Sequence, residues 1–402
     1  MKMSGTCLAA LLLGAMQASA ADAPPPGTSP QQAPLTPGGL VGIGSPALGA
    51  PGGLAGAAAT PANPIQLSAY FILNGSWTQE DAQFLAVGRN NGFTLGEARL
   101  ELTGRPADTL WLFLSIDGAV PLRQGDDLLA SSRQVALKDA YGVWAPLRHL
   151  RIQAGQFKAP QNIEGLLEET EIKFATRSIV TDGVHPPVGY DAAGLGLDRQ
   201  LGIAIGTDRI AFGHGGFAAQ VAVTNGNGPN QYVNDTQLPS VIGRAALDLF
   251  GSLSLGVDGY INPRAVGTQP NLFRENDLGF GGDLRFEARG LHLLLLAQYK
   301  SVVRVTSGLP NDSALGLSGE VAYRLGFFEP AVRVSYLDPS STVVATPGGP
   351  PLEAITWYTA GFNLYAPGPG AGRLSLDFTH RDEQAGRVLD NDGLDLSLQV
   401  RF

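Results

Sequence analysis

The sequence predicts an all-β fold, a transmembrane up-and-down antiparallel β-barrel of sixteen strands over residues 65–402. Three observations indicate it. Apolar and polar residues alternate with a period of two, as in 392–402, where Leu394 and Leu398 share one parity and Asp395 and Gln399 the other. The connections between such segments alternate between short and long. Beyond the N-terminus, no run approaches the roughly 18 apolar residues of a membrane-spanning helix.

Sixteen segments have strand character, each about 10–11 residues long. At roughly 3.3 Å per residue and a tilt of about 40°, such strands cross an apolar band of about 25 Å. In order they are 65–77, 93–104, 108–117, 134–145, 149–157, 198–206, 210–224, 240–249, 252–262, 277–288, 291–303, 313–325, 329–338, 355–365, 372–381 and 392–402.

The connections define the two ends of the barrel. We expect short periplasmic turns near 104–108, 146–148, 207–209, 250–252, 288–290, 326–328 and 367–372. We expect long external loops near 78–92, 118–133, 158–197, 225–239, 263–276, 304–312, 339–354 and 382–391. An even strand number then puts both termini on the periplasmic side. Aromatic girdle candidates at the membrane interfaces are Tyr70, Tyr299, Tyr336, Trp357, Tyr358 and Tyr365.

Two segments precede the barrel. Residues 1–20 combine Lys2, an apolar run and an Ala-Ser-Ala site, which predicts a secretory signal peptide rather than a buried N-terminal helix. Residues 21–64 hold ten prolines and one charge, Asp22, and we expect a disordered periplasmic tether. A peptidoglycan contact or a pore plug are the alternatives for this segment.

Composition excludes several classes of function. A net charge of −9 and a pI near 5.1 argue against a nucleic-acid partner. The only cysteine, Cys7, lies in the signal segment, so the exported chain has neither a disulfide nor a thiol nucleophile. Among the five histidines no pair has metal-ligand spacing, and no Gly-x-Ser-x-Gly motif is present, so we predict no enzyme, metal or cofactor. Asp390–Asp395 has the acid spacing of a calcium loop but lacks the distal glutamate.

Several stretches resemble the phosphate-selective porin O and P family. They are 98–117, 137–160 with its Gly-Gln-Phe-Lys-Ala-Pro exit, 174–180, 198–206, 221–230 and 327–338. The resemblance implies a homotrimeric barrel whose third loop, here 158–197, folds into the lumen as a constriction. It also implies attraction of phosphate by inward arginines and lysines. Phe402 is similar to the terminal aromatic that such barrels present to their insertion machinery.

The charges depart from that family picture. By parity the lumen faces carry nine basic residues: Arg99, Arg151, Arg244, Arg285, Lys300, Arg324, Arg333, Arg373 and Arg401. They also carry nine acids: Glu97, Glu101, Asp248, Asp258, Asp283, Glu287, Glu320, Asp377 and Asp395. The constriction loop holds Lys158, Lys173 and Arg177 against Glu164, Glu168, Glu169, Glu171, Asp182 and Asp191. An anion-specific pore needs a net positive field where it is narrow, and these counts do not supply one.

The sequence therefore predicts a porin in the outer membrane of a Gram-negative-type bacterium. Small hydrophilic solutes would diffuse passively, with weak or no selectivity, through a barrel in contact with lipid. One alternative is a phosphate- or oxyanion-selective porin for inorganic anions. A further alternative is a barrel with a plugged lumen and a structural or enzymatic role. In every case the lumen charges either pair across strands or contact the solute. Which of the two occurs depends on the strand register, which the sequence does not specify.

Overall fold

The computed structural model describes residues 65–401 apart from 85–86, 90, 124–130, 186–187, 232, 269, 306–309, 343–353, 368–371 and 385–387. The predicted signal peptide, the predicted tether 21–64 and Phe402 lie outside the described residues. None of the helices in the described residues is long and apolar enough to cross a membrane.

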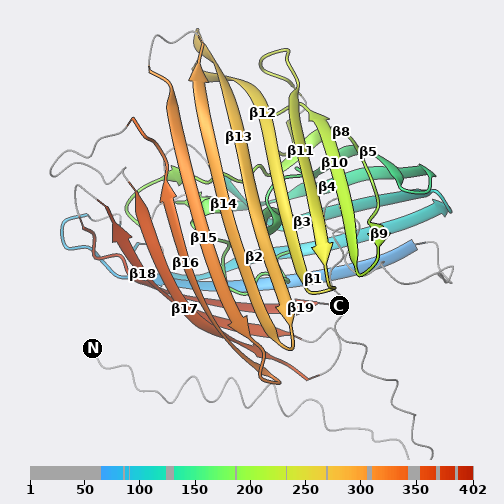
Figure 1. The fold of residues 1–402 in the computed structure, drawn as a ribbon. Helices are drawn as coiled ribbons and strands as arrows, with labels where there is room; N and C mark the ends of the chain where they lie inside the picture. The colour runs from blue at the N-terminus through green and yellow to red at the C-terminus, as the bar shows by residue number, and fades with distance from the viewer. Residues whose placement is uncertain are drawn as a thin grey trace, which may run out of the picture. The chain divides into compact units, whose positions relative to one another are not determined.

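The described chain is almost entirely β-structure (Figure 1). The wall strands are β1 (Ile65–Thr78), β2 (Gly92–Ala107), β3 (Leu110–Arg123), β4 (Ser131–Leu147), β5 (Leu150–Lys158), β8 (Arg199–Gly206), β9 (Ile210–Phe212), β10 (Gly215–Thr224), β11 (Ser240–Leu249), β12 (Leu253–Thr268), β13 (Asn271–Ala288), β14 (Leu291–Arg304), β15 (Asp312–Tyr323), β16 (Phe328–Asp338), β17 (Ile355–Tyr365), β18 (Arg373–Glu383) and β19 (Gly393–Arg401).

The sheet closes on itself. Every wall strand pairs antiparallel with its neighbours, and β19 returns to β1 with Leu398 opposite Leu73 and Ser397 opposite Asn74. β8 and β9 both pair with β10 and occupy one strand position. The structure is thus a closed 16-strand antiparallel barrel, which confirms the predicted fold class and the predicted closure of the last strand on the first.

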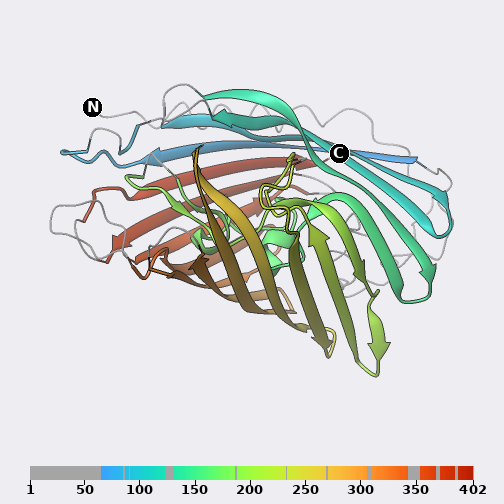
Figure 2. The same cartoon turned by 90° about the horizontal axis from the view of Figure 1, so that it is seen from above.

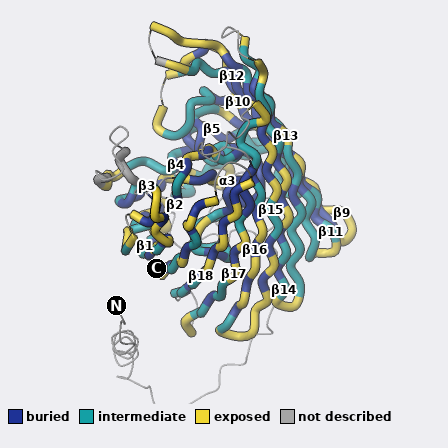
Figure 3. Tube along the Cα trace, turned by 90° about the vertical axis from the view of Figure 1, so that its left-hand side faces the viewer, coloured by how far each residue is buried: buried dark blue, intermediate teal, exposed yellow. Residues whose placement is uncertain are grey.

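The two faces of the wall differ along each strand, as the alternating colours in Figure 3 show. In β10 the outward Val221 and Val223 are 53% and 47% exposed, whereas Gln220 is 2% exposed. In β11 Val241 is 42% exposed and the neighbouring Ser240 is 1% exposed. Apolar side chains thus cover the outside and polar ones face the interior, the reverse of a soluble sandwich.

Tight turns join strands at one end of the barrel. Phe250 and Gly251 have φ of 54° and 71°, and Arg289 and Gly290 have φ of 50° and 86°. Two successive positive φ values match the right-handed twist of a two-residue hairpin, which explains the glycine at the second position.

Two predicted connections are wrong. The expected long loop 263–276 is part of the β12–β13 hairpin, in which Pro263 pairs with Asn276 and Thr268 with Asn271. The expected turn 207–209 is an interruption between β8 and β9, and the chain reverses at Gly213 and His214 instead. In both places the hydrogen-bonded ladder continues beyond the predicted end of the strand.

One long connection enters the barrel. Between β5 and β8 the chain forms two short helices, α2 (Ile163–Leu166) and α3 (Ile179–Asp182), and the short strand pair β6 (Gly183–Val184) and β7 (Ala192–Ala193). We call residues 159–198 the inner segment. In Figure 2 this green segment lies between the blue strands and the yellow to red ones.

Candidate functional site

The inner segment is bound to the wall on several sides. Gln161 Nε2 donates to Gln298 Oε1 of β14 at 3.2 Å, and Arg333 Nη1 of β16 donates to the Thr176 carbonyl at 2.8 Å. Further bonds join Asn363 of β17 to the Lys173 carbonyl (2.8 Å), Ala175 N–H to Asp377 of β18 (2.6 Å), and Gln399 of β19 to the Glu169 carbonyl (3.4 Å). The segment therefore crosses the interior.

The buried carboxylate of Glu164 joins parts of the inner segment through hydrogen bonds. Glu164, 2% exposed, accepts from Ser178 N–H at 2.7 Å, from Ser178 Oγ at 2.5 Å and from Thr181 Oγ1 at 2.6 Å. Asn162 precedes α2 and accepts from Gly165 N–H at 2.7 Å, the usual role of an N-cap side chain. These bonds fix α2 against the start of α3.

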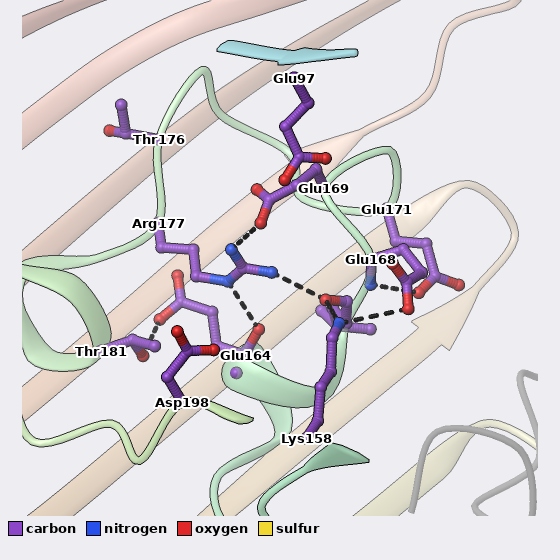
Figure 4. A network of polar contacts seen from close by, with 12 residues as sticks. Glu97, Lys158, Glu164, Glu168, Glu169, Glu171, Thr176, Arg177, Thr181 and Asp198 are labelled. Atoms are coloured by element: carbon purple, nitrogen blue, oxygen red, sulfur yellow. Dashed lines mark hydrogen bonds and ion pairs between the residues drawn. The ribbon is translucent and has the colours of Figure 1, made fainter. Parts of the chain in front are cut away.

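Two basic side chains satisfy the carbonyls that α2 leaves unpaired (Figure 4). Lys158 Nζ donates to the carbonyls of Leu166 and Leu167 at 3.2 and 2.7 Å. Arg177 donates to the Glu164 carbonyl at 3.1 Å and to that of Leu167 at 2.8 Å, and also pairs with Glu169. Both cations therefore serve the folding of the segment.

The barrel wall that faces the inner segment also carries a network of ion pairs. Arg99 of β2 binds Glu97 at 2.7 Å and Glu168 of the inner segment at 3.1 Å. Its guanidinium lies 5.0 Å from the centre of the Tyr70 ring. Lys158 also binds Glu168, at 3.2 Å. Glu168 thus links the segment to β2 and to the end of β5.

Burial and neighbouring charges shift the pKa values of two carboxyl groups in the inner segment. Burial would raise the pKa of Glu168, but Lys158, Arg99 and Arg199 outweigh it and lower the pKa to about 2. Asp182 behaves oppositely, because desolvation inside the barrel and the nearby Glu169 exceed the effect of Arg177 and raise its pKa to about 7. Asp182 still has an exposed surface, so it meets water within the interior.

An apolar cluster joins the segment to two other loops. Tyr190 and Val188 of the inner segment pack in one core with Val87 of the β1–β2 loop, Leu389 of the β18–β19 loop and Ile355 of β17. Trp357 contacts this cluster and donates its indole N–H to the Tyr190 hydroxyl at 3.3 Å.

Most predicted lumen charges lie on the inner face. Eleven are buried: Arg99, Arg244, Arg333, Arg373, Glu97, Glu101, Asp248, Asp258, Asp283, Glu320 and Asp377. Five are partly buried: Arg151, Arg285, Lys300, Glu287 and Asp395. Arg324 and Arg401 are exposed: Arg324 follows the end of β15 and stacks on Tyr365, and Arg401 is the last residue of β19.

The structure pairs many of these charges. Arg244 binds both oxygens of Asp283, at 2.6 and 2.8 Å, although β12 lies between their strands. Gly256 of β12 makes this possible, because a Cβ there would lie 2.2 Å from Arg244 Nη2 and 2.4 Å from Asp283 Oδ1. Arg285 pairs with Glu287 at 2.6 Å, and Arg151 pairs with Asp208.

Several of the predicted loop charges form ion pairs as well: Lys158, Glu168, Glu169, Lys173 and Arg177. Lys173 binds Glu329 of β16 at 3.3 Å. Glu171 accepts from the Glu168 N–H at 2.9 Å and so closes a turn within the inner segment. Of the other predicted loop charges, Lys158, Glu168, Glu169 and Arg177 take part in the contacts described above.

Several interior residues escaped prediction. Arg199 binds Asp139 at 3.0 Å, and Glu329 accepts from Lys173, Asn363 and Tyr365. Glu329 shares the parity of Arg333, which is a signal that the sequence did contain. Tyr70, Trp357 and Tyr365 face inward, each near an arginine, so their assignment to a girdle is wrong.

The histidines that form hydrogen bonds in the described residues contact carboxylates. His292 contacts Glu287 at 3.1 Å and Glu320 at 3.0 Å, and His380 contacts Asp392 at 2.9 Å. Within the same residues no group of three or more His, Cys, Asp or Glu could hold a metal ion.

No family model matches this chain, and no curated protein matches it. Solved structures match its fold. An anion-selective porin from Comamonas acidovorans aligns with a TM-score of 0.55 at 15% identity, over 84% of this chain and 99% of that one. The outer membrane channel DcaP of Acinetobacter baumannii gives 0.54 at 12%, over 84% and 97%. OmpT, an outer membrane protein of Vibrio cholerae, gives 0.54 at 9%, over 86% and 100%. The chain therefore has the barrel fold of outer-membrane porins and channels.

Proposed function

We propose that this protein is an outer-membrane porin through which small hydrophilic solutes diffuse passively. One observation carries the proposal: a closed wall, apolar outside and polar inside, is crossed by a segment bound to β14, β16, β17, β18 and β19. Such a segment narrows the interior, and solutes pass it without the making or breaking of covalent bonds. The gradient of the solute supplies the driving force.

The remaining parts of the proposal come from the sequence. Residues 1–20 direct export, 21–64 form a periplasmic tether, and Phe402 engages the barrel insertion machinery. A homotrimer rests on the resemblance to the phosphate-selective family. Cross-linking of the detergent-solubilised protein tests the trimer, and a monomer at every protein concentration would contradict it.

A second candidate is an oxyanion-preferring porin. Arg373 favours it, because the side chain is buried and, among the described residues, its Nε and Nη2 have no hydrogen-bond partner. An unpaired buried guanidinium is costly unless an anion reaches it. The ion pairs of Arg99, Arg244 and Arg285 weigh against a continuous positive path.

A barrel enzyme is less favoured. The contacts of His292 and His380 go to carboxylates rather than to a serine hydroxyl. An esterase assay on the solubilised protein addresses this alternative, and hydrolysis lost in His292→Ala would establish it.

Planar bilayers test the proposed function. The purified full-length protein should produce stepwise ohmic currents in KCl, and the heat-denatured protein should produce none. Phosphate is then added to both chambers. Block at low phosphate concentration that Arg373→Gln abolishes would favour the oxyanion porin, and no block would favour a general one. Absence of steps from folded protein would overturn the porin proposal.

A further inference from the structure

The ion pairs of the inner segment are asymmetric in their exposure to water. Arg99 and Lys158, which hold Glu168, have side chains 1% and 11% exposed, whereas Glu168 is 34% exposed. Arg177 is 10% exposed and its partner Glu169 is 26% exposed. The basic member of these pairs is thus covered by protein, and the carboxylate faces the interior water.

The same asymmetry holds where the segment ends. Arg199 is 7% exposed and remains bound to Asp139, while its second partner Asp198 is 61% exposed. Asp182 at the end of α3 is exposed as well. Lys173 is the exception, since it is 20% exposed and its partner Glu329 is 3% exposed.

A wall carboxylate adds to this field independently. Glu97 projects from β2 toward Glu169 of the segment, with the two carboxylates directed at one another (Figure 4). The Glu97 side chain is 9% exposed, and its Oε2 has no hydrogen-bond partner among the described residues. The cost of two like charges directed at one another is offset by basic side chains, since Glu97 pairs with Arg99 and Glu169 pairs with Arg177.

From these contacts we infer that the narrowed interior prefers small cations over anions, with Asp182, Asp198 and Glu169 as the residues that set the preference. The inference rests on the proposed porin function and names its permeant class. A permeating ion meets the carboxylates first, because Arg99, Lys158 and Arg177 lie behind them and are occupied by the carbonyls of α2 and by ion pairs. A ring of carboxylates on a narrow path raises the local concentration of cations and repels anions.

The test is the reversal potential under a KCl gradient across a planar bilayer. The wild type should be more permeable to potassium than to chloride. The double variant Asp182→Asn/Asp198→Asn should lower that ratio by more than about threefold, because a single charge roughly 7 Å from an ion in water already changes the local concentration of that ion about threefold. Asn is isosteric with Asp, and Arg199 keeps Asp139, so the segment retains its fold.

The control variant is Asp108→Asn. It removes one carboxylate charge at the turn between β2 and β3, where the side chain is 93% exposed, and it should leave the ratio unchanged. A wild-type preference for chloride, or a ratio that the double variant leaves unchanged, would overturn the inference while the porin proposal stands. Absence of channels altogether would overturn the porin proposal instead.

Discussion

Glu164 and Ser178, fourteen residues apart, are joined by two hydrogen bonds of 2.7 and 2.5 Å within the barrel. Ser178 gives both its N–H and its hydroxyl to one buried carboxylate, and Thr181 gives a third bond to the same group. These bonds connect the two helices of the inner segment. The shape of the segment therefore depends on one acidic residue that has no direct part in attracting solutes.

Replacing Glu164 by alanine should loosen the inner segment and leave the wall intact. Three buried donors would lose their acceptor, a loss of about 2–4 kcal/mol for the local structure. Single-channel conductance should rise and become noisier, while the heat-modifiable gel mobility of the folded barrel should persist. The control is Glu80→Ala, because Glu80 is exposed. Unchanged conductance in Glu164→Ala would show that the segment does not limit the flow.

Cation preference should depend on pH. Because the pKa of Asp182 is raised to about 7, its carboxyl is largely neutral near pH 6 and charged near pH 8. The potassium-to-chloride permeability ratio should therefore rise between about pH 6 and pH 8. Asp182→Asn should remove this rise. A ratio that falls over this range, or a rise that persists in the variant, contradicts the assignment to Asp182.

Gly155 should be intolerant of any side chain. It has a φ of +130°, and a Cβ there would lie 2.1 Å from the Ala140 carbonyl oxygen of the paired strand. Gly155→Ala should lower the unfolding temperature of the barrel in detergent, with a cost of about 2–3 kcal/mol. The matched control is Gly104→Ala, where the nearest atom is 3.9 Å away. Equal melting of the two variants would disprove the steric explanation.

Deletion of residues 21–64 behind the signal peptide should leave conductance unchanged if the segment is a tether. A plug would have to occupy the interior, and its removal would increase conductance sharply. Recordings from the deleted and full-length proteins at the same salt concentration distinguish the two. A sharp increase would favour the plugged-barrel alternative.

The architecture followed from the sequence because alternation and loop lengths are local properties of the chain. The β12–β13 hairpin is longer than the sequence predicts, because Pro263 lies within the ladder opposite Asn276 instead of ending a strand. Tyr70 has the residue type of an interface girdle but lies on the inward parity of β1, where its side chain is buried. In both places the position in the strand decides the outcome, and the residue type alone does not predict it.

The site was predictable only in part. Parity placed Arg244 and Asp283 inside, but their contact across β12 needs the register and the missing side chain of Gly256. The sequence shows how many basic residues the segment holds, whereas their burial against the carbonyls of α2 depends on the fold. Charge counts describe the total field, whereas selectivity depends on which charges meet water.

The contacts of the inner segment also constrain the order of assembly. The segment precedes β8 in the chain, but it is held by Arg333 of β16, Asp377 of β18 and Gln399 of β19. Those bonds form only after the last quarter of the polypeptide has been made and placed in the wall. A chain that lacks its final strands would therefore lose the narrow passage together with the closed wall, and an incomplete barrel would be leaky rather than merely unstable.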